Sequence, residues 1–321
     1  MARATGAALL IRNGMRILFV TSNRLGDAVL STGLLDHLIR VHPDARITVV
    51  CGPVAEGVFA RMPNRARTIV LEKRPYGRHW LPLWAATVTT VWDLVVDIRG
   101  SALSWLVPTR RRAVMRGGPG HKTAQLAAML GVAPAPLPVA WIGPQDRAVA
   151  DRLLPAGRPI VALAPTANWA PKVWPAERFA ALFRALAAGP LPNAVPVVFA
   201  GPGAFEADLA APLLAALPEA IDLTGGRLSL PEVAACLERS ALFVGNDSGL
   251  MHLAASAGAP TLGLFGPTDA GEYAPAGRRT LALVGAGKAM ETITTDAALA
   301  AALRLIGGEC GGRLGYTLVR A

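Results

Sequence analysis

Short apolar runs alternate with longer segments of helical periodicity along most of the chain. The first run, RILFVT at 16–21, is rich in β-branched and aromatic residues and predicts a central strand. Apolar residues then recur at helical spacing from Val29 to Leu38, and Pro43 ends this helix. Further strands are predicted at 47–51, 68–71, 94–97 and 113–115, with helices at 54–62 and 80–91. Uniformly apolar strands separated by helices predict a parallel sheet covered on both faces.

A proline-rich stretch divides the chain into two such sets of elements. Six prolines between residues 134 and 159 interrupt regular structure, although 145–154 can form one helix. Apolar strands resume at 160–164, 196–200, 242–244 and 261–265. At 321 residues, two domains are also the default expectation. We therefore predict two α/β domains, at 1–156 and 157–321.

The segment VGNDSGLMHLAASAGAPTLGLFGPTD at 244–269 brings polar residues to the ends of two predicted strands. Asp247 and Ser248 are residue types that cap helices, so a helix is predicted to begin near Ser248. The free amides and the positive dipole end of its first turn suit a phosphate. His252 lies one turn further along the same face. The turn GPTD then returns the chain to the same edge, where open α/β sheets bind nucleotides.

Each of these residues also has a plain structural explanation. Asp247 or Ser248 alone is typical of a helix cap, and His252 alone is typical of a hydrogen-bonded histidine in a core. The combination of all three with the GPTD turn, on one rim of a very apolar segment, favours a binding site.

Two other strand ends carry candidate residues. Asp27 lies where the first predicted strand turns into the first helix, a position that is also typical of an N-cap. In the loop PTANWAPKVWPAERF after 160–164, Lys172 can reach a diphosphate bound near Ser248, although a lone loop lysine is usually only surface. We expect Trp169 and Trp174 to flank this lysine as rigid walls, before a helix that begins near Pro175.

Charge is distributed unevenly between the two halves. Residues 1–158 hold 21 Lys+Arg and 9 Asp+Glu, a net charge of +12, whereas residues 159–321 hold 11 and 13, a net charge of −2, which sums to +10. A basic first half suggests an anionic surface or substrate, such as phospholipid headgroups, a phosphorylated glycolipid or nucleic acid. A general arginine bias in composition is the alternative, and nucleic-acid binding has no recognisable motif in its support.

Cysteine content and apolar runs indicate the compartment. Cys51, Cys236 and Cys310 are too scattered for a metal site, which favours a reducing cytosol without disulfides or structural zinc. The apolar run at 7–11 is too short for a signal peptide. Proline or glycine interrupts each long uncharged run, so no membrane-spanning helix is expected.

The most distinctive segments are NRLGDAVLSTGLL at 23–35, WAPKVWPAERF at 169–179 and the segment at 244–269, with VVDIRGS at 95–101 as a weaker one. In this order they resemble glycosyltransferase family 9, the lipopolysaccharide heptosyltransferase-like enzymes. The resemblance runs from residue 16 to about 307. It implies a GT-B fold, in which two Rossmann-like domains face each other across a cleft, the first binding the acceptor and the second the nucleotide sugar.

The resemblance also implies roles for individual residues. Asp27 would be the general base that takes the proton from the acceptor hydroxyl. Lys172 would hold the donor diphosphate. The expected donor contacts as a set are Thr166, Asn168, Lys172, Gly201, Asp247, Ser248, Gly249 and His252. Acceptor contacts are expected at Arg24, Arg110, Arg111, Arg112, Arg116 and His121.

The chain departs from the family pattern at the strand exit after 196–200. Family members often carry an acidic residue just after the glycine there, which holds the nucleotide ribose. Here the sequence reads Gly201-Pro202-Gly203-Ala204, and Glu206 is the nearest carboxylate. The family pattern therefore does not indicate which residue would hold the nucleotide ribose here.

These observations predict an inverting, metal-independent transferase that moves a sugar, expected to be an ADP-linked heptose, to a lipopolysaccharide core or related glycolipid. A base and a positive potential at the leaving group suffice for this displacement, and the chain has no Asp-x-Asp pair for a divalent ion. No cofactor is expected. The protein is expected to be a cytoplasmic monomer in peripheral contact with the inner membrane.

Two other function classes stay open from the residues alone. A non-catalytic glycan or lipid-headgroup binder with the same fold would need neither Asp27 nor Lys172. A dinucleotide oxidoreductase is disfavoured because the first strand is followed by SNRLGD rather than by a Gly-x-Gly-x-x-Gly turn.

Overall fold

Parallel strands form two sheets in the computed structural model, which describes residues 14–308 and 317–320. The first sheet has the order β3-β2-β1-β4-β5 and contains β1 (Arg16–Val20), β2 (Arg46–Cys51), β3 (Arg65–Val70), β4 (Trp92–Asp97) and β5 (Thr109–Val114). The second has the order β12-β11-β10-β9-β6-β7-β8 and contains β6 (Ile160–Ala164), β7 (Val195–Phe199), β8 (Ile221–Leu223), β9 (Leu242–Asn246), β10 (Thr261–Phe265), β11 (Thr280–Val284) and β12 (Thr317–Arg320). The predicted α/β class with two parallel sheets is confirmed.

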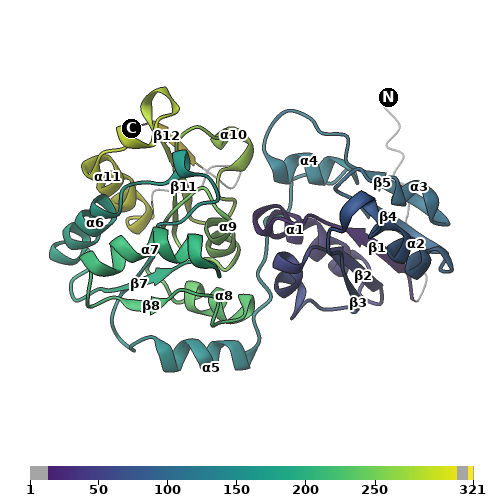
Figure 1. Ribbon diagram of the computed structural model, residues 1–321, viewed down its shortest axis with the longest axis horizontal. Helices are drawn as coiled ribbons and strands as arrows, with labels where there is room; N and C mark the ends of the chain where they lie inside the picture. Colours follow the sequence, from purple (N-terminus) through teal and green to yellow (C-terminus); the bar gives the residue numbers. More distant parts are fainter. Residues whose placement is uncertain (1–13, 309–316, 321) are drawn as a thin grey trace, which may run out of the picture.

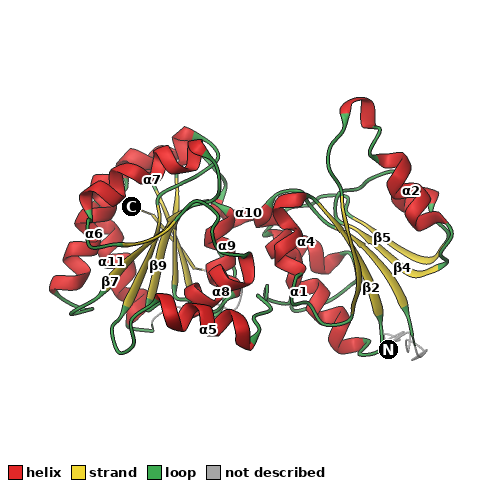
Figure 2. Cartoon of the chain, turned by 60° about the horizontal axis from the view of Figure 1, so that its bottom comes forward, coloured by secondary structure: helices red, strands yellow, loops and turns green. Residues whose placement is uncertain are grey.

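Helices cover both faces of the first sheet (Figure 2). The face toward the second half carries α1 (Leu25–Val41), the 3₁₀ helix η1 (Pro53–Phe59) and α4 (Lys122–Ala128), and the outer face carries α2 (Trp80–Val88) and α3 (Leu103–Leu106). Side chains alternate between the faces of a strand. Ile17 and Phe19 of β1 therefore pack with α1, whereas Leu18 and Val20 pack with Leu83 of α2.

The second sheet is covered in the same way (Figure 1). Its face toward the first half carries α8 (Leu230–Glu238) and α9 (Gly249–Ser256), and its outer face carries α6 (Ala176–Ala188), α7 (Ala204–Ala216) and α11 (Thr295–Ile306). The inner faces of the two sheets belong to one continuous apolar cluster. The two halves are therefore in direct contact through α1 and α9, which lie side by side in Figure 1.

The connection from β5 to β6 contains α4 and then α5 (Pro144–Leu153). Although α5 precedes residue 156, it packs on α8 of the second half. Arg147 Nε donates to Glu238 Oε2 at 2.7 Å, and Arg239 Nη1 donates to the Ala150 carbonyl at 3.0 Å. The division at residue 156 stays a prediction, and the contacts of α5 group it with the second sheet.

Two local predictions differ from the structure in helix type or in bounds. The helix expected at 54–62 is the shorter and tighter η1, in which Pro53 occupies a first-turn position. The strand expected at 113–115 is β5, which begins at Thr109 and includes three arginines. Charged residues are tolerated there because β5 lies at the edge of the sheet.

The expectations on cysteines and membrane segments rest on residues that the structure describes only in part. Cys51 and Cys236 are buried free thiols, and burial raises their pKa to about 12 and about 11 respectively. Cys310 and the apolar run at 7–11 lie outside the described residues. Within residues 14–308 and 317–320, every helix falls short of the length and apolarity that a bilayer crossing requires.

Candidate functional site

The first turn of α1 holds Asp27 at the carboxyl end of β1. Arg24 is the N-cap residue of this helix, so the alternative that Asp27 is an N-cap is wrong. Ser22 Oγ accepts the Arg24 amide at 3.1 Å and donates to Asp27 Oδ2 at 3.2 Å. Among the described residues, this is the one hydrogen bond of the Asp27 side chain, so the other carboxylate oxygen is available to a ligand.

The first turn of α9 leaves buried polar atoms without partners. Ser248 is the N-cap residue by position, but its hydroxyl makes no capping bond. Three buried side-chain atoms lack hydrogen-bond partners within the described chain: Ser248 Oγ, His252 Nδ1 and Thr268 Oγ1. Thr268 lies in the turn that follows β10. Buried polar groups are normally paired, and each unpaired one is costly. Three on one rim are typical of a site that a polar ligand completes.

The starts of α1 and α9 touch through glycines. A Cβ atom built on Gly26 would lie 2.9 Å from His252 Cδ2, and one built on Gly249 would lie 2.7 Å from Leu25 Cβ. Any larger residue at either position would force these helices apart. The contact brings the turn that carries Asp27 directly against the turn that carries His252.

Lys172 and Asp247 meet at the carboxyl ends of β6 and β9. Lys172 Nζ donates to Asp247 Oδ2 at 2.7 Å, and the two side chains are 15% and 8% exposed. Thr166, two residues beyond β6, is buried, whereas Asn168 is exposed. The loop therefore brings one cation to the rim near Ser248, already paired with a carboxylate.

The loop around Lys172 is held in place by buried residues. Asn246 at the end of β9 accepts the Trp174 amide at 3.1 Å and donates to the Pro165 carbonyl at 2.7 Å. Trp174 is fully buried, donates its indole N–H to the Ile293 carbonyl and packs edge-on against Phe179. The expectation that Trp174 forms a wall beside the lysine is therefore wrong, because its large apolar ring lies in the core. Trp169 is half exposed.

The glycine-rich exit of β7 has one carboxylate beside it. Glu206, in the first turn of α7, accepts the Gly201 amide through Oε2 at 3.2 Å. Gly203 has a φ of 110°, a conformation that favours glycine, and is the N-cap residue of α7. The Glu206 carboxylate therefore lies at the strand exit, bound to the Gly201 amide.

Electrostatics tie His252 to residues of both halves. Burial lowers its pKa to about 4. The carboxylates of Asp247 and Asp27 act in the opposite direction, and His121 and Lys172 add to the lowering. The imidazole is consequently neutral at pH 7, and a bound anion would raise its pKa.

A second contact between the halves joins α4 to α10 (Ala270–Tyr273). His121, the N-cap residue of α4, accepts the Thr123 amide at Nδ1 at 3.2 Å, and its Nε2 lies 2.9 Å from the Ala274 carbonyl. Because a carbonyl can only accept, Nε2 carries the proton. Gln125 Nε2 donates to Glu272 Oε1 at 3.3 Å. His121 thus bridges the halves; its role in acceptor binding stays a prediction.

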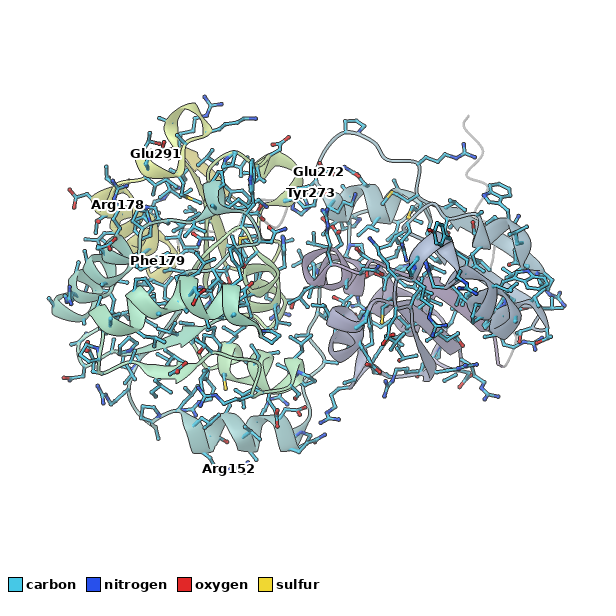
Figure 3. The ribbon with its side chains drawn as sticks, viewed as in Figure 1. Arg152, Arg178, Phe179, Glu272, Tyr273 and Glu291 are labelled. Carbon is cyan, nitrogen blue, oxygen red and sulfur yellow. The ribbon has the colours of Figure 1, made fainter. Side chains whose placement is uncertain are left out.

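Sequence reasoning did not find Tyr273, which lies with Glu272 between the two halves (Figure 3). Burial, the negative charge of Asp27 and a hydrogen bond with Glu272 raise the pKa of the Tyr273 hydroxyl to about 12. A neutral hydroxyl therefore lies within electrostatic reach of the expected base. No signal in the sequence could have placed it there, since 246 positions separate Tyr273 from Asp27.

Two of the expected acceptor arginines lie at the rim that holds Asp27. Arg24 directly precedes α1, and Arg116 follows the carboxyl end of β5. Both are exposed. Their positions are compatible with an anionic acceptor that approaches this edge.

The other three arginines lie elsewhere. Arg110 and Arg111 are exposed at the amino end of β5, the end away from Asp27, and Arg110 Nε lies 3.3 Å from Asp93 Oδ1. Arg112 donates to the Ser104 carbonyl, and its guanidinium lies 4.7 Å from the ring centroid of Trp105. These three do not join the rim site.

Within residues 14–308 and 317–320, no cluster of three or more His, Cys, Asp or Glu side chains could hold a metal ion. Positive potential at this rim comes from Lys172, which is paired with Asp247, and from the N–H dipoles of the first turn of α9.

Comparisons with known proteins agree with this architecture. The family model for glycosyltransferase family 9 (heptosyltransferase) matches residues 120–299, more than half of the chain. The chain is 28% identical over 302 residues to lipopolysaccharide heptosyltransferase 1 of Pseudomonas aeruginosa, which covers 82% of each protein.

Solved structures show the same fold. A family 9 glycosyltransferase from Veillonella parvula superposes with a TM-score of 0.76 at 21% identity, covering 92% of this chain and 99% of that one. The E. coli ADP-heptose lipopolysaccharide heptosyltransferase II superposes with a TM-score of 0.73 at 21% identity, with the same coverage. The expected GT-B arrangement of two Rossmann-like halves is thereby confirmed.

Proposed function

The chain belongs to glycosyltransferase family 9, the heptosyltransferase family, and on that premise we propose that it is an inverting, metal-independent sugar transferase. We propose an ADP-linked heptose as the donor and a lipopolysaccharide core or related glycolipid as the acceptor. The observation that carries the proposal is the contact of α1 with α9, through which Asp27 of the first half and His252 of the second face one site.

Asp27 is the proposed general base. An alcohol is a poor nucleophile, and a carboxylate that takes its proton in the transition state typically contributes about 10²-fold to 10⁴-fold in rate. Ser22 donates to one Asp27 oxygen and leaves the other for the acceptor hydroxyl. This orientation, with the base in one half and the donor groups in the other, supports attack from the side opposite to the leaving group and hence inversion.

The second half supplies the proposed leaving-group site. Lys172 and the first-turn amides of α9 offer positive potential to a diphosphate, which stabilises the charge that develops as the glycosidic bond breaks. Ser248 Oγ and His252 Nδ1 are buried and unpaired, so a diphosphate or the donor sugar would satisfy them. We propose that these groups replace the divalent ion that many sugar transferases use.

The proposed substrates follow from the relatives and from charge. The superposable E. coli enzyme is named for ADP-heptose, which supports an ADP-linked heptose here. The net charge of +12 on residues 1–158 supports an anionic acceptor bound by the first half. We place the enzyme at the cytoplasmic face of the inner membrane, as a monomer.

The alternative is a binding protein that retains the fold without turnover. Direct assay separates the two. The protein is incubated with ADP-heptose and a lipopolysaccharide core acceptor in the presence of EDTA, and ADP release is followed. We expect release with ADP-heptose, and NMR of the product should show the anomeric configuration inverted. Binding of the nucleotide sugar, seen as a raised Tm, without ADP release would favour the binding protein.

A further inference from the structure

The helix α2 is unusually apolar for a surface element. Residues 80–88 (WLPLWAATV) contain no charged side chain, yet only Leu83 and Thr87 are buried. Leu81 is 69% exposed and Trp84 is 38% exposed. A helix that is apolar on all sides is normally buried in a core or in a membrane. The outer side of α2 is therefore an apolar surface that no other described element covers.

The neighbouring helix α3 extends the same apolar surface. Trp105 is 61% exposed and Leu106 is 60% exposed. Trp84 Nε1 donates to the Leu106 carbonyl at 3.1 Å, which holds the two helices together as one face. Isolated exposed apolar residues are ordinary, but a contiguous patch usually marks an interaction site. We call this face, formed by Leu81, Trp84, Trp105 and Leu106, the α2–α3 face.

Basic residues outnumber acidic ones in the segment that contains the α2–α3 face. Residues 72–116 contain eight Lys+Arg and three Asp+Glu, a net charge of +5, and one of the three acids, Asp97, is fully buried. The guanidinium of Arg112 lies 4.7 Å from the Trp105 ring centroid, and that of Arg99 lies 5.4 Å from the Trp80 ring centroid. Tryptophan and leucine flanked by arginine suit the interface of a bilayer with anionic headgroups.

One hydrogen bond links the segment that contains the α2–α3 face to the loop before the expected base. Arg99 donates through Nη1 to Asn23 Oδ1 at 3.4 Å, and Asn23 belongs to the loop that leads from β1 to Asp27. In Figure 1, α2 and α3 lie at the end of the first half that is remote from the second half. A surface that covers this face would leave the residues around Lys172 accessible to a soluble donor.

We propose that the α2–α3 face docks onto the anionic surface of a phospholipid bilayer. Leu81, Trp84, Trp105 and Leu106 enter the boundary between headgroups and acyl chains, and arginines of residues 72–116 contact the phosphates. The proposal deepens the proposed function and rests on it in one respect, that the acceptor is lipid-linked and therefore lies in the same bilayer. Docking would keep the enzyme on the surface that contains such an acceptor.

Vesicle binding tests the docking without any substrate. The protein is mixed with vesicles of phosphatidylcholine and phosphatidylglycerol, or of phosphatidylcholine alone, and the bound fraction is measured by flotation. We expect binding to the anionic vesicles that weakens as salt is raised. Leu81→Gln/Leu106→Gln should lower the partition coefficient by about 10-fold or more, because both side chains lose their apolar transfer energy. The matched control Leu153→Gln/Leu303→Gln, at exposed leucines of α5 and α11, should bind as wild type.

A charge-reversal pair tests the electrostatic part separately. Arg78→Glu, next to α2, should weaken binding to anionic vesicles. The control Arg152→Glu on α5 should not, because Arg152 lies far from the α2–α3 face (Figure 3). Equal Tm values for the four variants and wild type would show that all are folded. Absence of wild-type binding, or equal losses in test and control variants, would overturn the proposal. So would a concentration-dependent dimer that Leu81→Gln/Leu106→Gln abolishes, since a second copy would then cover the face.

Turnover separates this inference from the proposed function. Leu81→Gln/Leu106→Gln should slow transfer to an acceptor embedded in vesicles and leave transfer to the acceptor freed of its lipid unchanged. If the variant matches the wild-type rate on the embedded acceptor as well as on the freed one, the α2–α3 face has no role in acceptor access. A protein that binds vesicles but transfers no sugar to either acceptor would retain the docking surface and refute the proposed activity.

Discussion

Lys172 and Asp247 form an ion pair of 2.7 Å, and both side chains are largely shielded from water. The positive charge of the lysine that we assign to the donor diphosphate is therefore already balanced by a carboxylate in this structure. A diphosphate that binds there must share or displace the carboxylate. Removing Lys172 alone would leave Asp247 with a largely buried, unpaired charge, so its effects on binding and on stability have to be separated.

Replacement of Lys172 by methionine should weaken ADP binding by about 1.5–3 kcal/mol, the range for a hydrogen bond to a charged group. The same variant should lose stability because the Asp247 carboxylate is left unpaired. In the double variant Lys172→Met/Asp247→Asn we expect the stability to recover and the ADP affinity to stay low. Calorimetry and denaturant unfolding measure the two quantities. An unchanged ADP affinity in both variants would remove Lys172 from the donor site.

Asp27→Asn should lower kcat by about 10²-fold or more, because asparagine cannot accept the proton of the acceptor hydroxyl. Since Arg24 is the N-cap residue, the helix loses at most its dipole interaction with the carboxylate, about 0.3–1 kcal/mol. The affinity for the donor should change little. Asp36→Asn in the same helix, which breaks only a surface pair with Arg40, is the control. Wild-type turnover in Asp27→Asn would end the case for this base.

Much of this arrangement follows from local sequence, and the reasons differ between elements. The strand predicted at 261–265 is β10 with the same bounds, because Pro260 and Gly266 limit an apolar run on both sides. β5 was harder to predict, since an edge strand with three arginines lacks the apolar pattern of a central strand. The positions of Ser248 and His252 at the start of α9 follow from the residues that favour helix starts.

Contacts between the two halves could not be predicted from the sequence. Trp174 was expected to flank Lys172 as a rigid wall, yet tertiary packing places its ring in the core. Tyr273 comes within electrostatic reach of Asp27 only through the fold, and no sequence periodicity indicates this. The free hydroxyl of Ser248 is a further example, because a serine before a helix usually caps it.

Burial of His252 should make the stability depend on pH. Its pKa is about 4 in the folded protein and about 6.5 in an unfolded chain. The folded state therefore binds fewer protons than the unfolded state between these values, and stability is lost as the pH falls from about 6.5 to 4. The loss attributable to this group approaches about 3 kcal/mol. Denaturant unfolding measures the free energy of unfolding against pH, and this profile should be flatter in His252→Gln than in wild type. Parallel profiles would contradict the assignment to His252.

The same imidazole should couple ADP binding to proton uptake. A diphosphate beside His252 raises its pKa, so the complex binds more protons than the free protein between the two pKa values. Calorimetry near pH 5.5 in two buffers of different ionisation enthalpy measures the uptake. We expect uptake in wild type and a smaller uptake in His252→Gln. Equal uptake in the two proteins would place the diphosphate away from this residue.

Gly249→Ala should disturb the contact between the halves. The new methyl group would lie 2.7 Å from Leu25 Cβ, so α1 or α9 has to move. We expect a loss of about 1–3 kcal/mol in the free energy of unfolding, the usual range for overpacking, together with slower turnover. Gly118→Ala is the control, since a Cβ there meets no atom within 4 Å. Wild-type stability and turnover in Gly249→Ala would show that the contact is loose.

The approach of the two halves through Gly26 and Gly249 affects how family members could be recombined. Each glycine lies against a side chain of the other half, Gly26 against His252 and Gly249 against Leu25, so both members of each pair must fit in a chimera. A chimera of two homologues is therefore best joined before Pro144, so that α5 travels with its partner α8. The bidentate pair of Arg61 with Asp146, at 3.0 and 2.9 Å, spans the graft, as does the pair of Gln125 with Glu272, so each parent must supply its side of both pairs.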